Sequence, residues 1–238
     1  MNESTKKLAL AHALEQMPDE ACGLVVNVGG KPRYHRCRNI ADKPREYFVL
    51  HPDDYAAAED SGQVITVVHS HPYTPAVPSP ADLEMCEQSG LPWAIVSVPT
   101  GVWHEFAPRG YVAPLYGRPF VHGVHDCYTF IRDWYSRERA IKLPDFDHPD
   151  NWWRSGGNLY VDGFARAGFE QCDKLHHGAV LLMQMGDTRV PNHGAVFLES
   201  GHLAHHMYNR LSCMDVYGGW FEKHTTHILR YMGNASNN

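Results

Sequence analysis

The chain has 238 residues, of which 43% are apolar and 20% are charged, and its formal net charge is −6. This composition is typical of a globular protein, and the length allows one large domain or two of about 100–150 residues each. The acidic balance, without any Lys/Arg block, argues against a nucleic-acid partner. The chain has neither an apolar run of the roughly 20 residues that a membrane span needs nor a signal-peptide core, so we expect cytoplasmic synthesis without secretory export.

Cysteine and histidine are the residue types that most need explanation. The six cysteines are scattered, without a CxxC pair, in a chain that is neither short nor visibly secreted. We therefore expect them to be reduced and mostly buried, with at least one available for catalysis. The 17 histidines are many for this length, and histidine is both the commonest metal ligand and the usual base at neutral pH.

The first half of the chain alternates predicted helices and strands. A helix over residues 4–17 has Ser4 as its expected N-cap and ends at Pro18. The elements expected after it are strands at 22–28 and 33–38, a third candidate strand at 47–50, a helix at 53–60, a buried strand at 64–68, a helix at 79–89 and a strand at 93–98. This alternation predicts a layered α/β domain.

A linker and a different element order follow. Residues 107–119 contain three prolines and two glycines without periodicity, which indicates a linker. Beyond it we expect a helix at 127–139, a loop at 144–153, a helix at 160–168 and strands at 179–185 and 194–198, whereas 233–238 should be disordered. Helices followed by strands predict an α+β domain.

One group of residues has the spacing of a metal site. The strand at 64–68 leads into His69-Ser70-His71-Pro72, and alternation places His69 and His71 on the same face of the strand. Two imidazoles on one face can bind zinc, which then needs a third ligand and an open position for water. Asp82, eleven residues after His71, can supply the third ligand.

Asp82 also has a purely structural interpretation. Ser79 before Pro80 is a good N-cap, and Asp82 at the third helical position would complete a capping-box-like start. On this alternative the two histidines are surface polar residues. A carboxylate at a helix start soon after a His-x-His strand end nevertheless favours convergence of three ligands, and Ser79 can both cap the helix and face the metal.

These residues resemble the JAMM/MPN+ metallopeptidase family. The family pattern is an upstream glutamate, then His-x-His-Pro, six residues, Ser, two residues and Asp, and residues 69–82 match it without a gap. The resemblance implies a mixed sheet with flanking helices over 1–108 and a Zn²⁺ ion bound by His69, His71 and Asp82. It also implies that Glu20 accepts the proton of the attacking water and that Ser79 stabilises the oxyanion.

A second group of residues follows the linker, which we place at 109–119. Phe130, Ile131, Trp134 and Tyr135 form a helical stripe, so Cys127 lies in the first turn of its helix, directly after Asp126. The helix dipole there favours the thiolate, and we expect the pKa of Cys127 to fall below its ordinary value of about 8.5. The alternative is a small buried cysteine without chemistry.

A thiol nucleophile needs a base and a group that orients the base. His193 stands at the head of a predicted strand, and a second strand after Gly201 would bring His205 beside it. A hydrogen bond between them would fix the tautomer of His193. His202 and His206 are alternatives for this third position.

The order Asp-Cys, apolar strand and His-Gly-Ala-Val-Phe resembles the NlpC/P60 peptidase family, which implies an α+β papain-like domain over 120–238. Two positions depart from the family pattern: Tyr128 replaces the usual serine after the cysteine, and Ala179 replaces the aspartate of a Gly-Asp pair. The resemblance implies Cys127 as nucleophile, His193 as base and His205 as the third member, with peptidoglycan stem peptides as substrate.

A JAMM-like domain followed by an NlpC/P60 domain resembles the tail-tip assembly proteins of lambda-like siphophages. The resemblance implies other phage tail-tip proteins as partners, the host cytoplasm during assembly and then the virion tail tip as location, and a zinc-dependent and a thiol-dependent peptidase site. Two other classes stay open: a structural tail component with vestigial sites, and a cytoplasmic metallo-isopeptidase.

Overall fold

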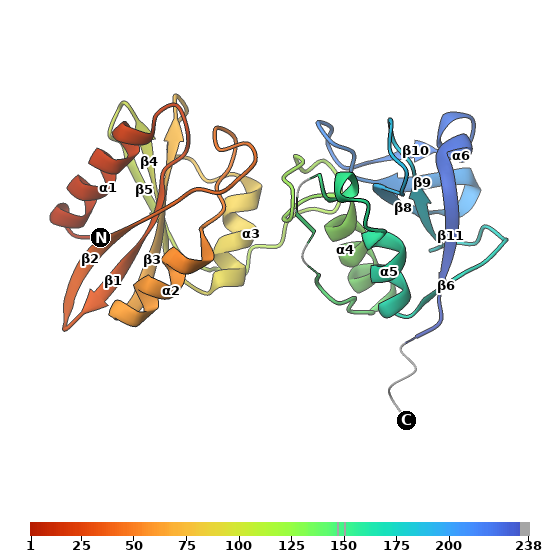
Figure 1. Cartoon of the computed structure of the whole chain (residues 1–238), viewed down its shortest axis with the longest axis horizontal. Coiled ribbons are helices and arrows are strands. Elements are labelled where there is room, and N and C mark those ends of the chain that lie inside the picture. The colour runs from red at the N-terminus through yellow and green to blue at the C-terminus, as the bar shows by residue number, and fades with distance from the viewer. Residues whose placement is uncertain (147, 150, 234–238) are drawn as a thin grey trace. The chain divides into compact units, whose positions relative to one another are not determined.

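The chain folds into two compact units, Met1–Val112 and Ala113–Asn238, in the computed structural model (Figure 1). The model describes residues 1–146, 148–149 and 151–233. The division between the units falls inside the segment 109–119. Each unit has its own apolar core, and each is described by itself.

The first unit is built on a five-stranded mixed sheet. Its elements are α1 (Glu3–Gln16), β1 (Cys22–Val28), β2 (Lys31–Cys37), α2 (Pro52–Ser61), β3 (Gln63–Pro72), α3 (Pro80–Ser89), β4 (Trp93–Val98) and β5 (Trp103–Phe106). The strand order is β2-β1-β3-β4-β5, with β3 and β4 parallel and the other neighbours antiparallel.

Helices cover both faces of this sheet, as strand alternation requires (Figure 1). On one face Val68 and Ala94 pack with Ala9 of α1. On the other face Val67 of β3 packs with Ala58 of α2 and Cys86 of α3. Since side chains alternate along β3, His69 and His71 share the face of Val67, which is the face that α3 covers.

The structure corrects three local expectations in this unit. Asn2 rather than Ser4 caps α1, because its side chain accepts the amide of Thr5 at 2.9 Å. Residues 47–50 form no strand, and only an isolated bridge joins Asn39 to Leu50. Finally, β3 is longer than expected and carries both histidines within the strand, while β5 was not predicted.

The second unit contains a six-stranded antiparallel sheet. Its elements are α4 (Cys127–Arg139), the short helix η1 (Trp152–Ser155), α5 (Leu159–Arg166), β6 (Phe169–Gln171), β7 (Val180–Met183), β8 (His193–Phe197), the short helix η2 (Glu199–Gly201), β9 (His202–His205), β10 (Cys213–Val216), α6 (Trp220–His224) and β11 (Thr225–Tyr231). The strand order is β10-β9-β8-β7-β11-β6.

Helix α4 packs on one face of this sheet and forms the core of the unit with it. Phe130, Ile131 and Trp134 of α4 share a buried cluster with Val180 and Val196 of the sheet. Gly194 permits this approach, because a Cβ at that position would lie 2.7 Å from Ile131 Cδ1. The predicted bounds of α4 are confirmed, whereas β6, β10, α6 and β11 were not predicted.

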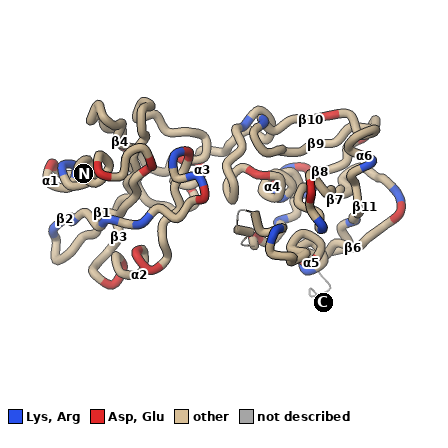
Figure 2. Tube along the Cα trace, turned by 45° about the horizontal axis from the view of Figure 1, so that its top comes forward, with Lys and Arg blue, Asp and Glu red and all other residues tan. Residues whose placement is uncertain are grey.

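All six cysteines are free, four of them buried, as expected. In the part of the chain that the structure describes, no helix is both long and apolar enough to cross a membrane. Acidic and basic residues are interspersed along both units (Figure 2). Of the tail 233–238, expected to be disordered, only Gly233 lies within the described residues.

Candidate active sites

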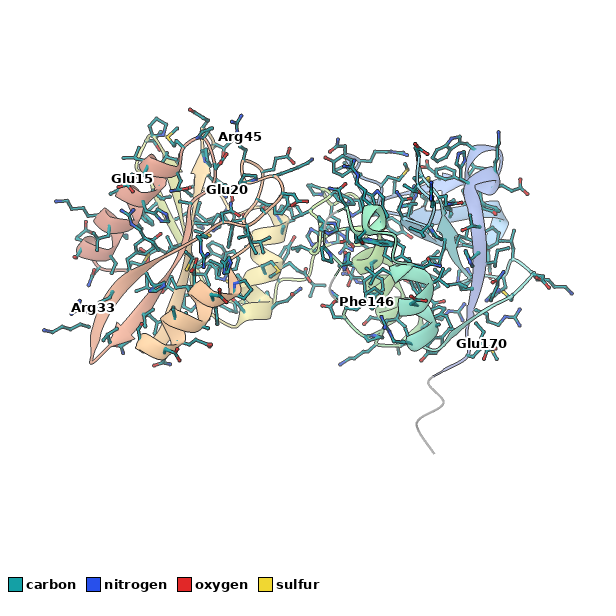
Figure 3. All side chains as sticks on the ribbon, viewed as in Figure 1. Glu15, Glu20, Arg33, Arg45, Phe146 and Glu170 are labelled. Atoms are coloured by element: carbon teal, nitrogen blue, oxygen red, sulfur yellow. The ribbon has the colours of Figure 1, made fainter. Side chains whose placement is uncertain are left out.

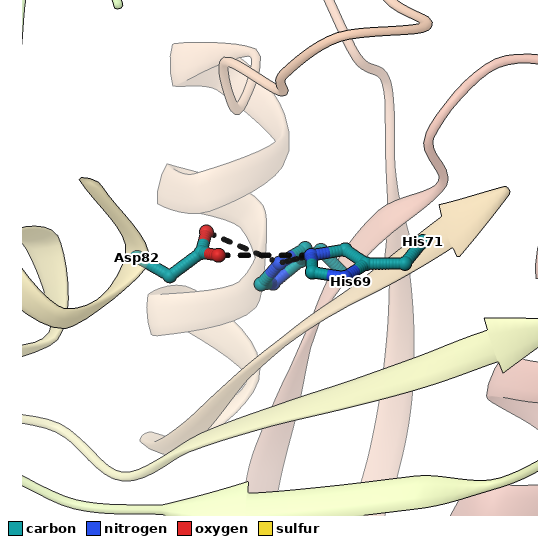
Figure 4. Close-up of side chains that lie close together, drawn as sticks. All are labelled: His69, His71 and Asp82. Carbon is teal, nitrogen blue, oxygen red and sulfur yellow. Dashed lines mark hydrogen bonds and ion pairs between the residues drawn. The ribbon is translucent and has the colours of Figure 1, made fainter. Parts of the chain in front are cut away.

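Strand β3 and helix α3 bring three potential metal ligands together in the first unit (Figure 4). His69 Nε2 lies 3.1 Å from His71 Nε2 and 3.2 Å from Asp82 Oδ1, and His71 Nε2 lies 3.6 Å from Asp82 Oδ2. All three ligands expected from the sequence therefore point at one small volume. Burial opposes ionisation of Asp82, but the charge of His69 and hydrogen bonds from His69, His71 and the Ser79 amide hold its pKa well below its usual range.

The surroundings of the histidines fix their rings. His71 Nδ1 is 2.9 Å from the carbonyl oxygen of Pro75, so Nδ1 donates and Nε2 keeps its lone pair for a ligand. Phe48 stacks on His69 with 4.7 Å between ring centroids, and Trp93 meets it edge-on at 5.6 Å. The Pro75 carbonyl thus orients the His71 ring, and aromatic packing orients the His69 ring, so that both Nε2 atoms are held in place.

Ser79 and Asp82 start α3 with a capping box. Ser79 Oγ accepts the amide of Asp82 at 3.1 Å, and Asp82 Oδ2 accepts the amide of Ser79 at 2.7 Å. The capping role and the position beside the histidines are therefore not alternatives. The cap itself holds the Asp82 carboxylate toward β3.

Glu20 precedes β1 and is labelled in Figure 3. Its side chain is buried, its backbone amide donates to Pro44 O at 2.6 Å, and its carbonyl accepts from Asn39 Nδ2 at 3.0 Å. Burial raises the pKa of Glu20 to about 7, while the positive charges of His69 and His71 oppose the rise. The expected base is thus anchored through its backbone close enough to both histidines to feel their charge.

The residues at this site fit zinc. Ligands placed tetrahedrally about 2.0–2.1 Å from Zn²⁺ lie about 3.3 Å from one another. His69 Nε2 lies 3.1 Å from His71 Nε2 and 3.2 Å from Asp82 Oδ1, both close to this value, and the second carboxylate oxygen, Oδ2, lies 3.6 Å from His71 Nε2. Two nitrogens and one carboxylate oxygen are also a donor set of catalytic zinc sites, which keep a fourth position open.

In the second unit Cys127 is the first residue of α4, as expected. Asp126 caps the helix: its Oδ1 accepts the amide of Thr129 at 2.9 Å, and its amide donates to Thr129 Oγ1 at 2.8 Å. Cys127 Sγ lies 2.9 Å from the hydroxyl of Tyr160, and the amide of Gly194 also faces the sulfur. The thiol therefore lies at the start of α4, next to the Tyr160 hydroxyl and to Gly194 of β8.

The expected low pKa of Cys127 is wrong for this structure. Burial, followed by the charge of Asp126, raises the pKa of the thiol to about 12, and the hydrogen bonds from Tyr160 and Gly194 offset only part of the rise. The helix dipole does not compensate for lost solvation because a fully buried thiolate has no water to stabilise it. The resting group is a neutral thiol.

A chain of hydrogen bonds leads away from His193. His193 Nε2 lies 3.0 Å from His205 Nδ1 on the neighbouring strand β9, and His205 Nε2 lies 3.1 Å from Asp215 Oδ2 on β10. Burial lowers the pKa of His193 and of His205, with the nearby His205 charge adding to the effect on His193, so both rings are neutral at pH 7. The hydrogen bond expected between the two histidines is present.

The other two candidates for the third position lie elsewhere. His202 is exposed at the start of β9. His206 is buried, but its Nε2 is 3.1 Å from the carbonyl oxygen of Arg210 and its ring packs edge-on against Phe120. Among these histidines, only His205 has a described hydrogen bond to His193.

Sequence reasoning missed two residues of this site. Asp215 alternates with Met214 and Val216 along β10, and this short strand was not predicted. The sequence marks Tyr160 only as the first residue of an expected helix, yet its hydroxyl is the described side-chain partner of the Cys127 sulfur. The alternation in Cys213–Val216 spans only four residues and is too short to identify the strand, and no local signal marks Tyr160.

Comparison with known proteins agrees with both resemblances. A model described as prokaryotic homologs of the JAB domain matches residues 3–108, and the NlpC/P60 family model matches residues 117–230. The chain is 39% identical over 236 residues to tail tip assembly protein K of Escherichia phage N15, covering 97% of this chain and 96% of that protein. It is 39% identical over 184 residues to the protein of the same name from Escherichia phage lambda, covering 76% and 89%.

The first unit has a further relative. It is 29% identical over 103 residues to the CysO-cysteine peptidase of Mycobacterium tuberculosis, covering 40% of this chain and 70% of that protein. The fold is accordingly a JAB/MPN-like α/β unit followed by an NlpC/P60 α+β unit. With its full-length similarity to the phage proteins, the chain belongs to the tail tip assembly protein K family.

Proposed function

We propose that this protein acts in phage tail-tip assembly and carries two peptidase sites. The second unit hydrolyses amide bonds of peptidoglycan stem peptides with Cys127, and the first unit hydrolyses a peptide or isopeptide bond with zinc. The names of the phage relatives support the assembly role, other tail-tip proteins as partners and a place in the virion tail tip. The proposal also includes the host cytoplasm as the location during assembly. The hydrogen-bond chain from Asp215 to His193 is the observation that carries the thiol-peptidase proposal.

That chain determines which nitrogen of His193 acts as base. Asp215 is a carboxylate and can only accept, so His205 donates to it from Nε2–H and has a lone pair at Nδ1. His193 then donates Nε2–H to that lone pair, which leaves the lone pair of Nδ1 for a proton from Cys127. Asp215 and His205 are thus positioning residues that act through His193.

The neutral state of the thiol and of His193 specifies how the nucleophile forms. Because burial disfavours both the thiolate and the imidazolium, the proton passes from Cys127 to His193 Nδ1 as the sulfur attacks the carbonyl carbon. Amide groups at the start of α4 stabilise the negative oxygen. His193 then returns the proton to the leaving amine, and water releases the acyl group from the sulfur.

In the first unit, zinc bound by His69, His71 and Asp82 would polarise the scissile carbonyl and lower the pKa of the attacking water. Glu20 accepts the proton of that water. The hydroxyl of Ser79, which accepts from Asp82 N, still has its own hydrogen to donate to the oxyanion. The distances of 3.1 and 3.2 Å from His69 Nε2 to His71 Nε2 and to Asp82 Oδ1 support this assignment.

Two other functions each have a supporting observation. Burial of Cys127 and its hydrogen bond to Tyr160 favour a structural tail component whose thiol site is vestigial. Similarity of the first unit to a protein named CysO-cysteine peptidase favours the alternative of a peptidase that acts apart from the phage tail, as a cytoplasmic metallo-isopeptidase would. Cleavage of peptidoglycan by the purified chain separates the proposal from both.

The experiment is digestion of purified peptidoglycan by the wild-type chain, Cys127→Ala and Asp215→Asn, with analysis of the released peptides. We expect new stem-peptide ends with the wild type, none with Cys127→Ala, and a reduced rate with Asp215→Asn because the base loses its orienting acceptor. Tyr217→Phe is the matched control, because Tyr217 lies two residues after Asp215 on the same segment and is not part of the hydrogen-bond chain. Equal product from wild type and Cys127→Ala contradicts the proposal.

A further inference from the structure

Strands β9 and β10 gather a second set of metal-binding atoms in the C-terminal unit. Cys213 lies directly opposite His205 in the strand register, and Asp215 follows two residues later on the same face of β10. Asp215 Oδ2 lies 3.1 Å from His205 Nε2 and 3.9 Å from Cys213 Sγ. The three donor atoms all lie within 4.8 Å of one another.

These separations are near those of a zinc site with one sulfur ligand. With Zn–S at about 2.3 Å and Zn–N or Zn–O at about 2.0–2.1 Å, tetrahedral ligands stand about 3.3 Å apart for N and O and about 3.5 Å apart for S and O. The measured values, 3.1 and 3.9 Å, need shifts of only a few tenths of an ångström. Histidine, thiolate and carboxylate are all ligands of Zn²⁺ and of related divalent ions.

A cation already contacts two of the three residues. Arg210 Nη1 donates to Asp215 Oδ2 at 3.0 Å, and its Nη2 is 3.7 Å from Cys213 Sγ. The Arg210 side chain is 48% exposed, so it can move into solvent without leaving a buried charge behind. The cluster therefore favours a positive charge, and the Arg210 side chain that now supplies it can move away to admit a metal ion.

We propose that His205, Cys213 and Asp215 bind a divalent transition-metal ion and that this ion inhibits the cysteine site. Binding displaces the Arg210 guanidinium from the cluster. It also removes the proton of the Cys213 thiol, and this proton is released to solvent. The inhibitory part rests on the proposed function of Cys127 and His193. The binding part rests only on the three donor atoms.

Inhibition follows from the tautomers of the two histidines. A metal ion on His205 Nε2 needs the lone pair of that nitrogen, so the ring proton of His205 moves to Nδ1. His205 Nδ1–H then donates to His193 Nε2, and the proton of His193 moves to Nδ1. With Nδ1 protonated, His193 cannot accept the proton of Cys127, although no ligand blocks the thiol itself.

The binding test is a cobalt(II) titration of the full chain carrying His71→Ala and Cys127→Ala, which disrupt the candidate metal site of the first unit and remove the thiol of the proposed cysteine site. A thiolate-to-cobalt charge-transfer band reports a sulfur ligand directly and needs no enzyme activity. We expect the band to saturate at one equivalent, to vanish with Cys213→Ser and to persist with Cys172→Ser, the matched change at the other half-buried cysteine. Absence of the band, or its persistence with Cys213→Ser, overturns the proposal.

The inhibition test adds zinc to the chain during cleavage of a stem peptide. Cys213→Ser should keep its basal rate and require at least about tenfold more zinc for half inhibition, because one of three ligands is lost. Arg210→Gln should require less zinc than the wild type. Equal sensitivity of wild type and Cys213→Ser overturns the inhibitory role, whereas a wild type without any activity counts against the proposed function and leaves the cobalt result to decide on the site.

Discussion

Ser79 and Asp82 hold each other through two reciprocal hydrogen bonds, of 3.1 Å from Asp82 N to Ser79 Oγ and 2.7 Å from Ser79 N to Asp82 Oδ2. The same carboxylate faces His69 and His71. A helix cap and a proposed metal ligand are therefore combined in one side chain. Substitutions at the two positions should separate stability from metal binding.

Asp82→Asn should keep the cap but lose the metal. The asparagine oxygen can still accept the amide of Ser79, whereas the anionic ligand is gone. Ser79→Ala should do the reverse: it removes the acceptor for Asp82 N, costs about 1 kcal/mol of unfolding free energy and leaves close to one zinc per chain. Elemental analysis and urea unfolding of both variants check this. Full zinc content in folded Asp82→Asn would refute the ligand assignment.

Cys127 should react slowly with iodoacetamide at neutral pH. Its thiol is buried and neutral, whereas Cys172 and Cys213 are partly exposed. We expect Cys127 to be alkylated at least about tenfold more slowly than these two. Mass spectrometry of timed samples gives the rates, and labelling in denaturant should remove the difference. If Cys127 is alkylated first in the folded chain, its thiolate is preformed and the proton-transfer account is wrong.

Local patterns predicted that His69, His71 and Asp82 come together, and tertiary contacts decided what the sequence missed. His69 and His71 share a face because β3 alternates, and Asp82 is placed by the cap that Ser79 begins. Both signals lie within a few residues. The pKa of Cys127 instead depends mainly on burial in a cluster whose members are distant in sequence, and the hydrogen bond from Tyr160 only partly opposes the rise. Helix position alone therefore gave the wrong direction for that thiol.

The partner of His205 was missed for a related reason. Asp215 lies on β10, a four-residue strand with two exposed apolar side chains, so its pattern is too short to identify the strand. Pairing of β10 with β9 depends on the intervening turn. The sequence thus indicated His193 and His205, but not the carboxylate that determines their tautomers.

Stem-peptide cleavage should persist below the ordinary pKa of histidine. Burial and the nearby His205 charge lower the pKa of His193 well below 6.5, and the base works only when it is unprotonated. As the pH falls, activity should therefore be lost only at a pH clearly below 6.5. A profile of kcat/KM against pH checks this. An acidic limb at or above pH 6.5 would show that His193 is solvated or is not the base.

The buried pair of Asp126 and His148 should make stability depend on pH. His148 Nε2 lies 2.7 Å from Asp126 Oδ2, and this contact raises the pKa of His148 and lowers that of Asp126, although burial opposes both shifts. The Asp126 contribution is present above pH 3.8 and is lost as the pH falls through its lowered pKa. The His148 contribution is present below pH 6.5 and is lost as the pH rises through its raised pKa.

His148→Asn should therefore lower the unfolding free energy of the second unit most in mildly acidic solution. We expect a loss of roughly 1–3 kcal/mol near pH 6 and a smaller one near pH 9, where His148 is neutral in the wild type. His176→Asn, at a partly exposed histidine of the same unit, is the control. Urea unfolding at both pH values gives the comparison, and a loss that is larger near pH 9 would contradict the ion pair.

The two-site account is tested most directly by stem-peptide hydrolysis with the wild type and Cys127→Ala, each with and without a zinc chelator. The account predicts that Cys127→Ala abolishes cleavage while its zinc content is unchanged. It also predicts that chelation removes zinc from the first unit and spares cleavage by the wild type. Loss of cleavage on chelation of a chain that stays folded, together with cleavage by Cys127→Ala, would contradict it and place the hydrolysis at His69, His71 and Asp82.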